Sequence, residues 1–177
     1  MDRKKLFTAE FRRRTAGMIR SFFLPSLTPA TLLRMALVAL TALVVFGFVL
    51  RPCFINGESM LPTYNRSGLV FCNLLRYWRD VPRRGDVVVI SYFGKRYLLK
   101  RIIAMEGESI EFKGGKVLIN GEELSEPYVR YPCSWDMEPV VVAPGHCFVV
   151  GDNRSQPQEE HIFGEVSLKR IAGGLLL

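Results

Sequence analysis

An uncharged apolar segment, MALVALTALVVFGFVL, lies between Arg34 and Arg51 and constrains this chain more than any other feature. Its 16 residues would span about 24 Å as a helix, and apolar neighbours on both sides lengthen it toward a hydrocarbon core of about 30 Å. The segment begins late in the chain, and no small-x-small cleavage site follows it, as a removable secretion signal would require. We therefore expect one uncleaved transmembrane helix over residues 34–54, with a buried core helix as the alternative.

The charge distribution gives an orientation to this helix. The net charge is +7, and the first 34 residues carry eight Lys or Arg side chains against two acidic ones, whereas the rest is nearly balanced. Positive charge before a spanning helix keeps the N-terminus in the cytoplasm. We expect a basic cytoplasmic tail over residues 1–33, disordered or lying along the lipid surface, and an extracytoplasmic domain over residues 55–177. A basic tail on a neutral domain does not fit a nucleic-acid-binding face, so the lipid bilayer is the expected partner and nucleic acid is not.

Beyond residue 55 the pattern is typical of β-strands. Short runs of Val, Ile, Leu and Phe are separated by Gly, Pro and Asn; they read GLVFCNLL, GDVVVISYF, RYLLKRIIAME, SIEFK, KVLING, HCFVVGD and EVSLKRIAGGLLL. Gly114-Gly115 and Asn120-Gly121 indicate tight hairpin turns. The proline-rich residues 125–145 are expected to form an extended excursion between strands. The fold class is therefore mostly β, an antiparallel domain that is closed or folded over to protect its edges, preceded by one N-terminal transmembrane helix.

The four cysteines give no metal motif. Outside the cytoplasm disulfides are permitted, and Cys133 and Cys147 flank a predicted loop and could pair, whereas Cys53 and Cys72 resemble apolar fillers. There is no C-x-x-C pair and there are only two histidines, so we expect no metal site and no cofactor.

Ser59 stands in the segment NGESMLPTY, directly after the apolar helix. It is either an ordinary turn residue or a nucleophile, and a serine nucleophile needs a base. The segment is not a G-x-S-x-G elbow, because Leu61 occupies the place of the second glycine. His146 and His161 are not excluded as bases on sequence grounds.

Lys100 is a second candidate for the base. It lies in YLLKRII, where strand alternation places it on the face of Leu98 and Ile102, and Arg101 on the other face. If that face is buried, desolvation lowers the lysine pKa from about 10.4, and a neutral amine can accept a serine proton. The alternative is a lysine that extends from an edge strand into solvent.

Four motifs in order resemble the type I signal peptidases. NGESMLPTY resembles the serine motif; RGDVVVI follows it, then YLLKRIIAMEGESIEFKGGKVLINGEEL resembles the lysine motif with its hairpin, and PGHCFVVGDNRS with FGEV resembles the late Gly-Asp-Asn-Arg motif. The resemblance covers roughly residues 35–177. It implies a single-pass serine endopeptidase of the bacterial inner membrane, with its catalytic domain in the periplasm, that removes signal peptides from exported preproteins.

The resemblance also implies roles for individual residues. Ser59 would be the nucleophile of an acyl-enzyme mechanism, its backbone N–H an oxyanion donor, and Lys100 the general base. Gly57 stands where some members carry a serine hydroxyl, so the second oxyanion donor is unassigned. Met60 either helps to build the shallow pockets that select small residues at the first and third positions before the cut, or fills the core.

Asp152 and Arg154 belong to the late motif and are expected to support the site structurally, with Asp152 paired to Arg101. The family usually continues with a serine and then Asp-Ser-Arg, a group that orients the lysine. Here the corresponding residues are Pro157, Glu159, Glu160 and His161. Either Glu159 and His161 form a substitute pair, or Lys100 lacks a hydroxyl partner and activity is reduced or tuned.

Other functions also fit part of this pattern. Self-cleaving repressors use Ser-Lys chemistry but carry a DNA-binding domain instead of an anchor. A specialised peptidase with a narrow substrate range is the closer alternative, and a non-catalytic membrane-tethered β module that binds exported chains is the alternative from another class. The presence of both Ser59 and Lys100 favours an active enzyme.

Overall fold

The computed structural model describes residues 28–92, 97–160 and 164–176, and the chain forms two compact units, Met1–Val44 and Val45–Leu177. Most of the basic tail predicted over residues 1–33 lies outside the described residues. The second unit contains all the strands that the structure describes and is called the β unit below.

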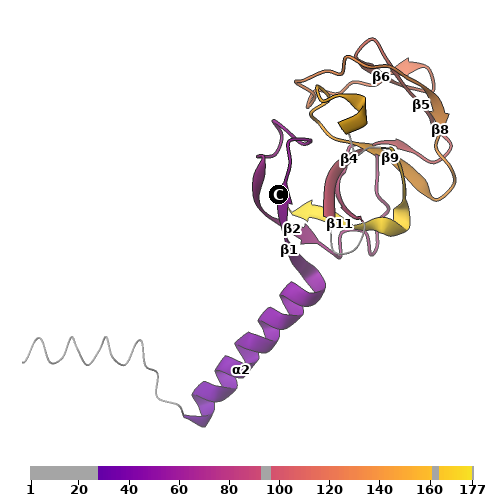
Figure 1. Cartoon of the computed structure of the whole chain (residues 1–177). Coiled ribbons are helices and arrows are strands. Elements are labelled where there is room, and N and C mark those ends of the chain that lie inside the picture. The colour runs from indigo at the N-terminus through magenta and orange to yellow at the C-terminus, as the bar shows by residue number, and fades with distance from the viewer. Residues whose placement is uncertain (1–27, 93–96, 161–163, 177) are drawn as a thin grey trace, which may run out of the picture. The chain divides into compact units, whose positions relative to one another are not determined.

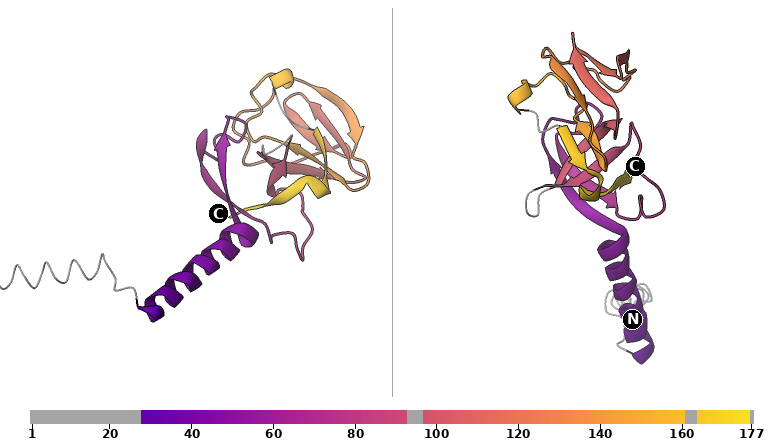
Figure 2. Two further views of the ribbon diagram at one scale, coloured as in Figure 1. Left: turned by 60° about the horizontal axis from the view of Figure 1, so that its bottom comes forward. Right: turned by 90° about the vertical axis from the view of Figure 1, so that its right-hand side faces the viewer.

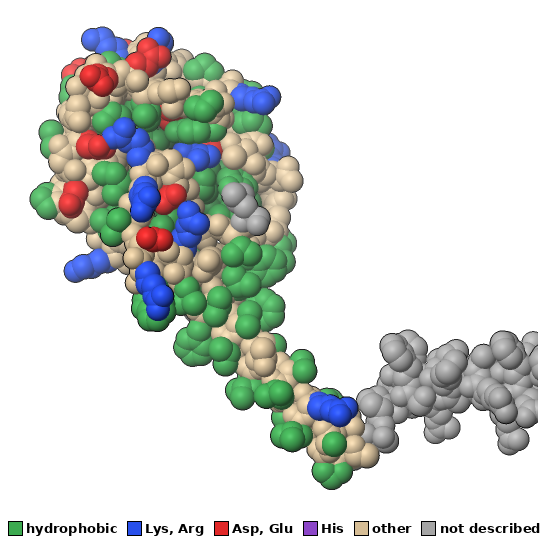
Figure 3. Space-filling view, turned by 180° about the vertical axis from the view of Figure 1, so that it is seen from behind, with side chains coloured by type: hydrophobic (Ala, Val, Ile, Leu, Met, Phe, Trp, Pro, Cys, Tyr) green, Lys and Arg blue, Asp and Glu red, His purple; other side chains and the backbone are tan. Residues whose placement is uncertain are grey.

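The described part of the first unit is helix α2, Pro29–Val44, which continues into a π-helical turn, Val45–Val49. Thr28 Oγ1 accepts a hydrogen bond from the Thr31 N–H at 3.3 Å, and Pro29 takes the first helical position, as at many helix starts. The 21 residues Pro29–Val49 have a mean hydropathy of 2.4 and bury no side chain, so they are long and apolar enough to cross a membrane. Figure 3 shows hydrophobic side chains around this helix and charged side chains over the β unit.

The helix begins earlier than residue 34 and ends before residue 54. Residues 50–54 are not helical because they pair with a second strand, an interaction that the local apolar pattern does not reveal.

Seven antiparallel strands form the larger sheet of the β unit (Figure 1). Their order across the sheet is β1 (Leu50–Asn56), β2 (Ser67–Asn73), β11 (Ile171–Leu176), β3 (Val87–Ser91), β4 (Tyr97–Met105), β9 (His146–Val150) and β10 (Gly164–Ser167). The sheet curls, because β1 and β4 are in contact although three strands separate them in this order.

The smaller sheet has four strands and lies at one end of the β unit, beyond β4 and β9 (Figure 2). Its order is β7 (Glu122–Glu123), β6 (Lys116–Ile119), β5 (Ser109–Lys113) and β8 (Met137–Val141). Gly114 and Gly115, with φ of 55° and 80°, form the β5–β6 turn, and Asn120 and Gly121, with φ of 52° and 84°, form the β6–β7 turn. Both predicted hairpin turns are therefore confirmed.

The core consists of three apolar clusters. One joins β4 and β9 to the smaller sheet and includes Phe112, Val117 and Phe148. The second, around Met60, Val89 and Leu99, lies inside the curl of the larger sheet, and the third centres on β3, β4 and β9. Both faces of β4 are therefore covered.

The structure confirms an antiparallel β domain preceded by an apolar helix, corrects two expectations and answers one question that the sequence left open. Residues 125–145 are not wholly an irregular excursion, because they contain β8. The final run 165–177 is not one strand, because a 3₁₀ turn, Leu168–Arg170, separates β10 from β11. Cys133 and Cys147 are not bonded to each other but lie in separate clusters.

Candidate active site

Ser59 lies in the turn that follows β1. Gly57, whose φ of 146° favours glycine, donates its N–H to the Arg66 carbonyl at 2.8 Å. The Leu61 N–H bonds to the Glu58 carbonyl at 3.1 Å, and an ion pair joins Glu58 to Arg66 across the base of the turn. Among the described residues, none accepts a hydrogen bond from the Ser59 N–H.

The segment after β9 holds this turn from the other side. Asn153 donates its N–H to the Ser59 carbonyl at 2.9 Å and its side-chain amide to the Glu58 carbonyl at 3.1 Å. Gly151 packs so closely that a Cβ at this position would lie 2.1 Å from the Ser59 carbonyl oxygen. The late motif therefore fixes the position of the serine backbone.

Lys100 lies in the middle of β4, opposite Val88 of β3, and only 3% of it is exposed. The prediction of a buried lysine is confirmed, and the alternative of a lysine extending into solvent is wrong. Burial lowers the pKa of Lys100 from 10.5 to about 8, although the Asp152 carboxylate opposes this shift. No described residue forms a hydrogen bond or ion pair with its amine.

Ser59 and Lys100 line the same small pocket, which opens between the end of β1 and the start of β4. Met60 is buried in the core cluster and also lines this pocket, so its position fits both roles expected from the sequence. Gly57 lines it as well; the remaining residues around the pocket are Ile55, Asn56, Asn65, Tyr97, Leu98 and Leu99.

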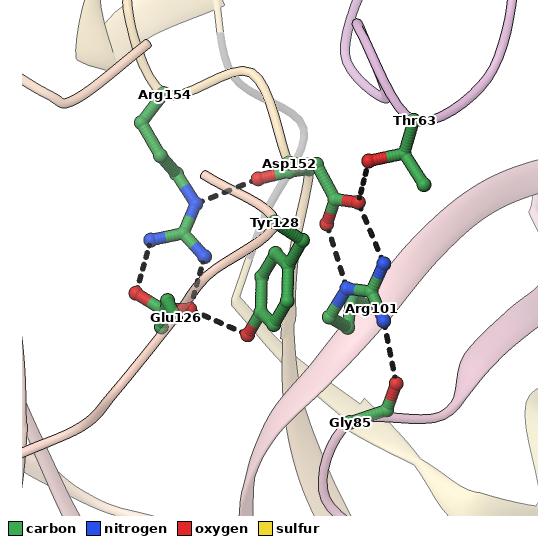
Figure 4. Close-up of polar contacts among 8 residues, drawn as sticks. Thr63, Gly85, Arg101, Glu126, Tyr128, Asp152 and Arg154 are labelled. Atoms are coloured by element: carbon green, nitrogen blue, oxygen red, sulfur yellow. Dashed lines mark hydrogen bonds and ion pairs between the residues drawn. The ribbon is translucent and has the colours of Figure 1, made fainter. Parts of the chain in front are cut away.

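A network of buried charges lies next to the serine turn (Figure 4). Asp152, which is fully buried, accepts hydrogen bonds from Arg101 Nε at 2.8 Å and Nη2 at 2.7 Å, as the sequence suggested. Its carboxylate also accepts a hydrogen bond from Thr63 Oγ1 at 2.6 Å. Because Thr63 follows Ser59 by four residues and Arg101 follows Lys100 by one, Asp152 ties the two candidate residues to a common support.

Arg154 makes the second half of the network. Its Nε donates to the Gly151 carbonyl at 2.6 Å, and its Nη2 and Nη1 donate to the Glu126 carboxylate at 2.6 and 3.1 Å. Tyr128 donates its hydroxyl to the same carboxylate, and the Arg101 guanidinium lies 3.9 Å from the Tyr128 ring centre. Burial and Glu126 raise the pKa of Tyr128, so that hydroxyl keeps its proton. Every buried charge of this network thus has a partner, as buried ions require.

The loop after Arg154 makes fewer contacts. Glu159 is exposed in a 3₁₀ turn, Gln158–Glu160, and forms no hydrogen bond or ion pair with the described residues. His161 lies outside the described residues, so the suggested Glu159–His161 pair stays a prediction. Pro157 offers no hydroxyl to Lys100.

The cysteines stay out of this chemistry. Burial raises the pKa of Cys72 and of Cys147 to about 11, so both remain unreactive thiols. Cys53 and Cys72 pack in the core cluster with Met60, which confirms them as apolar fillers. Within the described ranges, no three His, Cys, Asp or Glu side chains gather as a metal site would need.

Several residues of the site had no assigned role in the sequence. Gly151, Asn153 and Thr63 lie inside the quoted motifs, so their position was visible although their contacts were not. Tyr97, which receives a hydrogen bond from Arg51 Nη1 at 2.9 Å, also lies inside a quoted motif. The pair Glu126 and Tyr128 lies outside the motifs and gave no local signal.

Comparison with known proteins identifies the family of this chain. The model of the family "Signal peptidase, peptidase S26" matches residues 29–176. Signal peptidase I of Leptolyngbya laminosa is 33% identical over 141 residues, which cover 75% of this chain and 70% of that protein. Signal peptidase I of Bacillus amyloliquefaciens is 33% identical over 144 residues, covering 75% and 77%.

One of the similar proteins is a chloroplast enzyme. The chloroplastic thylakoidal processing peptidase 1 of Arabidopsis thaliana is 30% identical over 151 residues, which cover 78% of this chain but 44% of that protein. Among solved structures, a signal peptidase I from Enterococcus faecalis matches with a TM-score of 0.47 and 27% identity, covering 55% of this chain and 98% of that one. The family match over residues 29–176, together with relatives above 30% identity, shows that the chain belongs to the signal peptidase family, peptidase S26.

Proposed function

We propose that this chain removes signal peptides from exported preproteins with Ser59 as the nucleophile and Lys100 as the general base. The observation that carries the assignment is the shared pocket, which is lined by both Ser59 and Lys100, a buried lysine with a pKa near 8. About half of this amine is neutral at pH 8, and the neutral form can accept a proton.

The reaction proceeds in two steps. The Ser59 Oγ attacks the scissile carbonyl carbon while Lys100 Nζ takes the hydroxyl proton. The C–N bond then breaks, and the ammonium returns that proton to the leaving amine, which gives an ester between Ser59 and the signal peptide. Lys100 next takes a proton from water, the hydroxide attacks the ester, and the Ser59 oxygen recovers a proton as the signal peptide leaves.

The oxyanion of each step needs hydrogen-bond donors. The Ser59 N–H is the candidate for the first donor, since no described group accepts a hydrogen bond from it. Gly57 supplies no side-chain donor. Asn56 and Asn65 carry the side-chain amides that line the pocket, so they are the candidates for the second donor.

The substrate would lie as an added strand along β1. β1 is an edge strand of the larger sheet, so its free backbone groups can pair with an extended peptide. Ile55, Met60 and Leu99 offer a shallow apolar lining, which favours small residues at the first and third positions before the cut.

The family and the apolar helix support the membrane arrangement that we propose. The enzyme is membrane-anchored, and we assign residues 1–33 to a cytoplasmic tail, the apolar segment to a single span, and residues 55–177 to the extracytoplasmic side. The bacterial inner membrane is the first candidate. A thylakoid membrane is the second, because relatives include cyanobacterial and thylakoidal enzymes.

A narrow-range peptidase of the same fold is the second candidate function. It is favoured by one observation: the described residues give Lys100 no hydroxyl partner, and Pro157 occupies the motif position of the usual serine.

A cleavage assay tests the proposal. The full chain in detergent is offered a preprotein with a small-x-small site, and Ser59→Ala and Lys100→Ala are compared with Ser67→Ala and Lys116→Ala, which change exposed residues outside the pocket. We expect both site variants to lose cleavage by at least about a thousandfold, since nucleophile and base act as a unit, and both control variants to keep it. Cleavage that persists in either site variant would refute the dyad, and a wild type that binds but never cuts would indicate a binding module.

A further inference from the structure

We propose that residues 74–86, called the β2–β3 loop, form a lipid-binding surface that lies among the headgroups of an anionic bilayer. The inference rests on the membrane anchoring of the family and on contacts within the β unit. It does not depend on the Ser59–Lys100 assignment.

The loop begins where the apolar helical segment ends. Leu50 pairs with Asn73 in the β1–β2 ladder, and the Leu74 N–H donates a hydrogen bond to the Val49 carbonyl at 2.9 Å. Val49 is the last residue of the helical span Pro29–Val49 and belongs to the β unit. Chain continuity therefore puts the start of this loop beside the point where the chain leaves the lipid, whatever the direction of the helix.

The loop exposes large apolar side chains. Trp78 is 73% exposed, Val81 69% and Leu75 45%. Single exposed apolar residues are common, but three within seven residues beside a membrane entry point favour an apolar partner. Tryptophan in particular concentrates at the membrane–water interface, where its ring sits at headgroup depth.

Hydrogen bonds hold the loop in this form. Asn73 Oδ1 accepts the Leu75 N–H at 3.0 Å, and Asp86 Oδ2 accepts the Arg83 N–H at 3.0 Å and the Tyr77 hydroxyl at 3.1 Å. Pro82 is buried between these two anchor points. The apolar side chains are thus exposed in a loop whose conformation is fixed by hydrogen bonds.

The positive charge of the loop indicates that its lipid partner is anionic. It carries four arginines against two aspartates. Arg84 is paired with Glu108 and Arg76 lies 3.7 Å from Asp86, but Arg79 and Arg83 have no carboxylate partner among the described residues. The Arg79 guanidinium lies 5.2 Å from the Trp78 ring centre. Free cations beside an interfacial aromatic ring fit anionic phosphate headgroups, to which each such charge adds affinity.

The two tryptophans of the chain make a direct test possible. Trp135 packs against Phe112, with ring centres 4.7 Å apart, and donates a hydrogen bond to the Gln156 carbonyl. Its fluorescence therefore reports on the surroundings of the smaller sheet. The full chain is reconstituted in vesicles as Trp135→Phe, which leaves Trp78, and as the matched control Trp78→Phe, which leaves Trp135. Fluorescence quenching is measured with lipids brominated near the start of their acyl chains and with aqueous iodide. If Trp135→Phe does not fold, the Trp78 signal is obtained by subtracting the control from the wild type.

We expect bromine to quench Trp78 and leave Trp135 unaffected. Vesicles of phosphatidylcholine with phosphatidylglycerol should give roughly twofold more bromine quenching of Trp78 than phosphatidylcholine alone, and Arg79→Gln with Arg83→Gln should abolish the difference. Trp78 open to iodide and untouched by bromine would overturn the proposal. Protection from iodide without bromine quenching would also overturn it, since the loop would then contact a protein, for example a second copy of the chain.

Discussion

Lys100 is buried in β4 beside apolar side chains, where an ammonium ion is poorly solvated. The fold tolerates this residue although an apolar side chain would pack there at lower free energy. Burial of Lys100 has a chemical consequence, because the same desolvation that destabilises the ammonium makes the neutral amine available as a base.

This conflict predicts that Lys100→Met stabilises the fold at neutral pH. The pKa of Lys100 is lowered on folding from 10.5 to about 8. Below about pH 8 both states are protonated and the folded state bears the full penalty, roughly 3 kcal/mol; the penalty declines as pH rises and is gone above 10.5. The melting temperature of the variant in detergent should therefore exceed that of wild type at pH 7, and the gap should shrink toward pH 10.

The exposed Lys116→Met serves as the control and should show no such pH-dependent gap, because Lys116 lies in an exposed ion pair with Glu123. A Lys100→Met variant that is less stable than wild type at pH 7 would contradict a desolvated amine.

Gly151 is the second residue on which the site depends. An alanine there would place its Cβ 2.1 Å from the Ser59 carbonyl oxygen, so the serine turn must shift. We expect Gly151→Ala to lower kcat/KM by about a hundredfold, the loss typical of an ångström-scale displacement of a reacting group. Gly68→Ala is the matched control, since no atom lies within 4 Å of its added Cβ. Equal activity of the two variants would show that Gly151 does not position Ser59.

At the scale of elements, Asp152 joins three segments of the β unit. It follows β9, binds Arg101 of β4, and accepts the Thr63 hydroxyl from the serine turn. The Asp152 charge also raises the pKa of Lys100, against the larger effect of burial. The network therefore both holds the site and moderates the basicity of its lysine.

Asp152→Asn should consequently shift the pH dependence of kcat/KM. Removing the negative charge lowers the pKa of Lys100 further, so the rising limb of kcat/KM against pH should move to lower pH, together with a loss of stability. Glu126→Gln is the comparison: it also breaks a buried ion pair, but Glu126 does not influence the pKa of Lys100. A limb that moves equally in both variants would indicate general loosening of the site.

The elements that could be predicted are those with local signals. The Gly114-Gly115 and Asn120-Gly121 turns and the strands beside them follow from neighbouring residues. β8 could not be predicted, because its pairing with β5 spans a proline-rich stretch without alternation. Glu126 was missed for a related reason: its role depends on the ion pair with Arg154, which lies far away in sequence.

The same distinction holds for the site. The motifs pointed to Ser59 and Lys100, but alternation could only say which residues share a face with the lysine. Its burial depends on β1 curling over β4, a long-range contact. The support from Gly151 and Asn153 likewise needs β9 and the serine turn to meet in space.

At the scale of the whole molecule, a helix without buried side chains precedes a β unit with a complete core. Pro29–Val49 is long and apolar enough to cross a membrane, which fits the membrane-anchored enzymes of the family. The β2–β3 loop would add a second, weaker contact to the same surface.

The pH dependence of kcat/KM for preprotein cleavage by the full chain tests the central claim, that a desolvated Lys100 activates Ser59. A general base must be unprotonated in the free enzyme, so activity should rise with pH along a limb with an apparent pKa near 8. A limb near 6.5, the ordinary value for histidine, or one at 10 or above, the value for a solvated lysine, would contradict it.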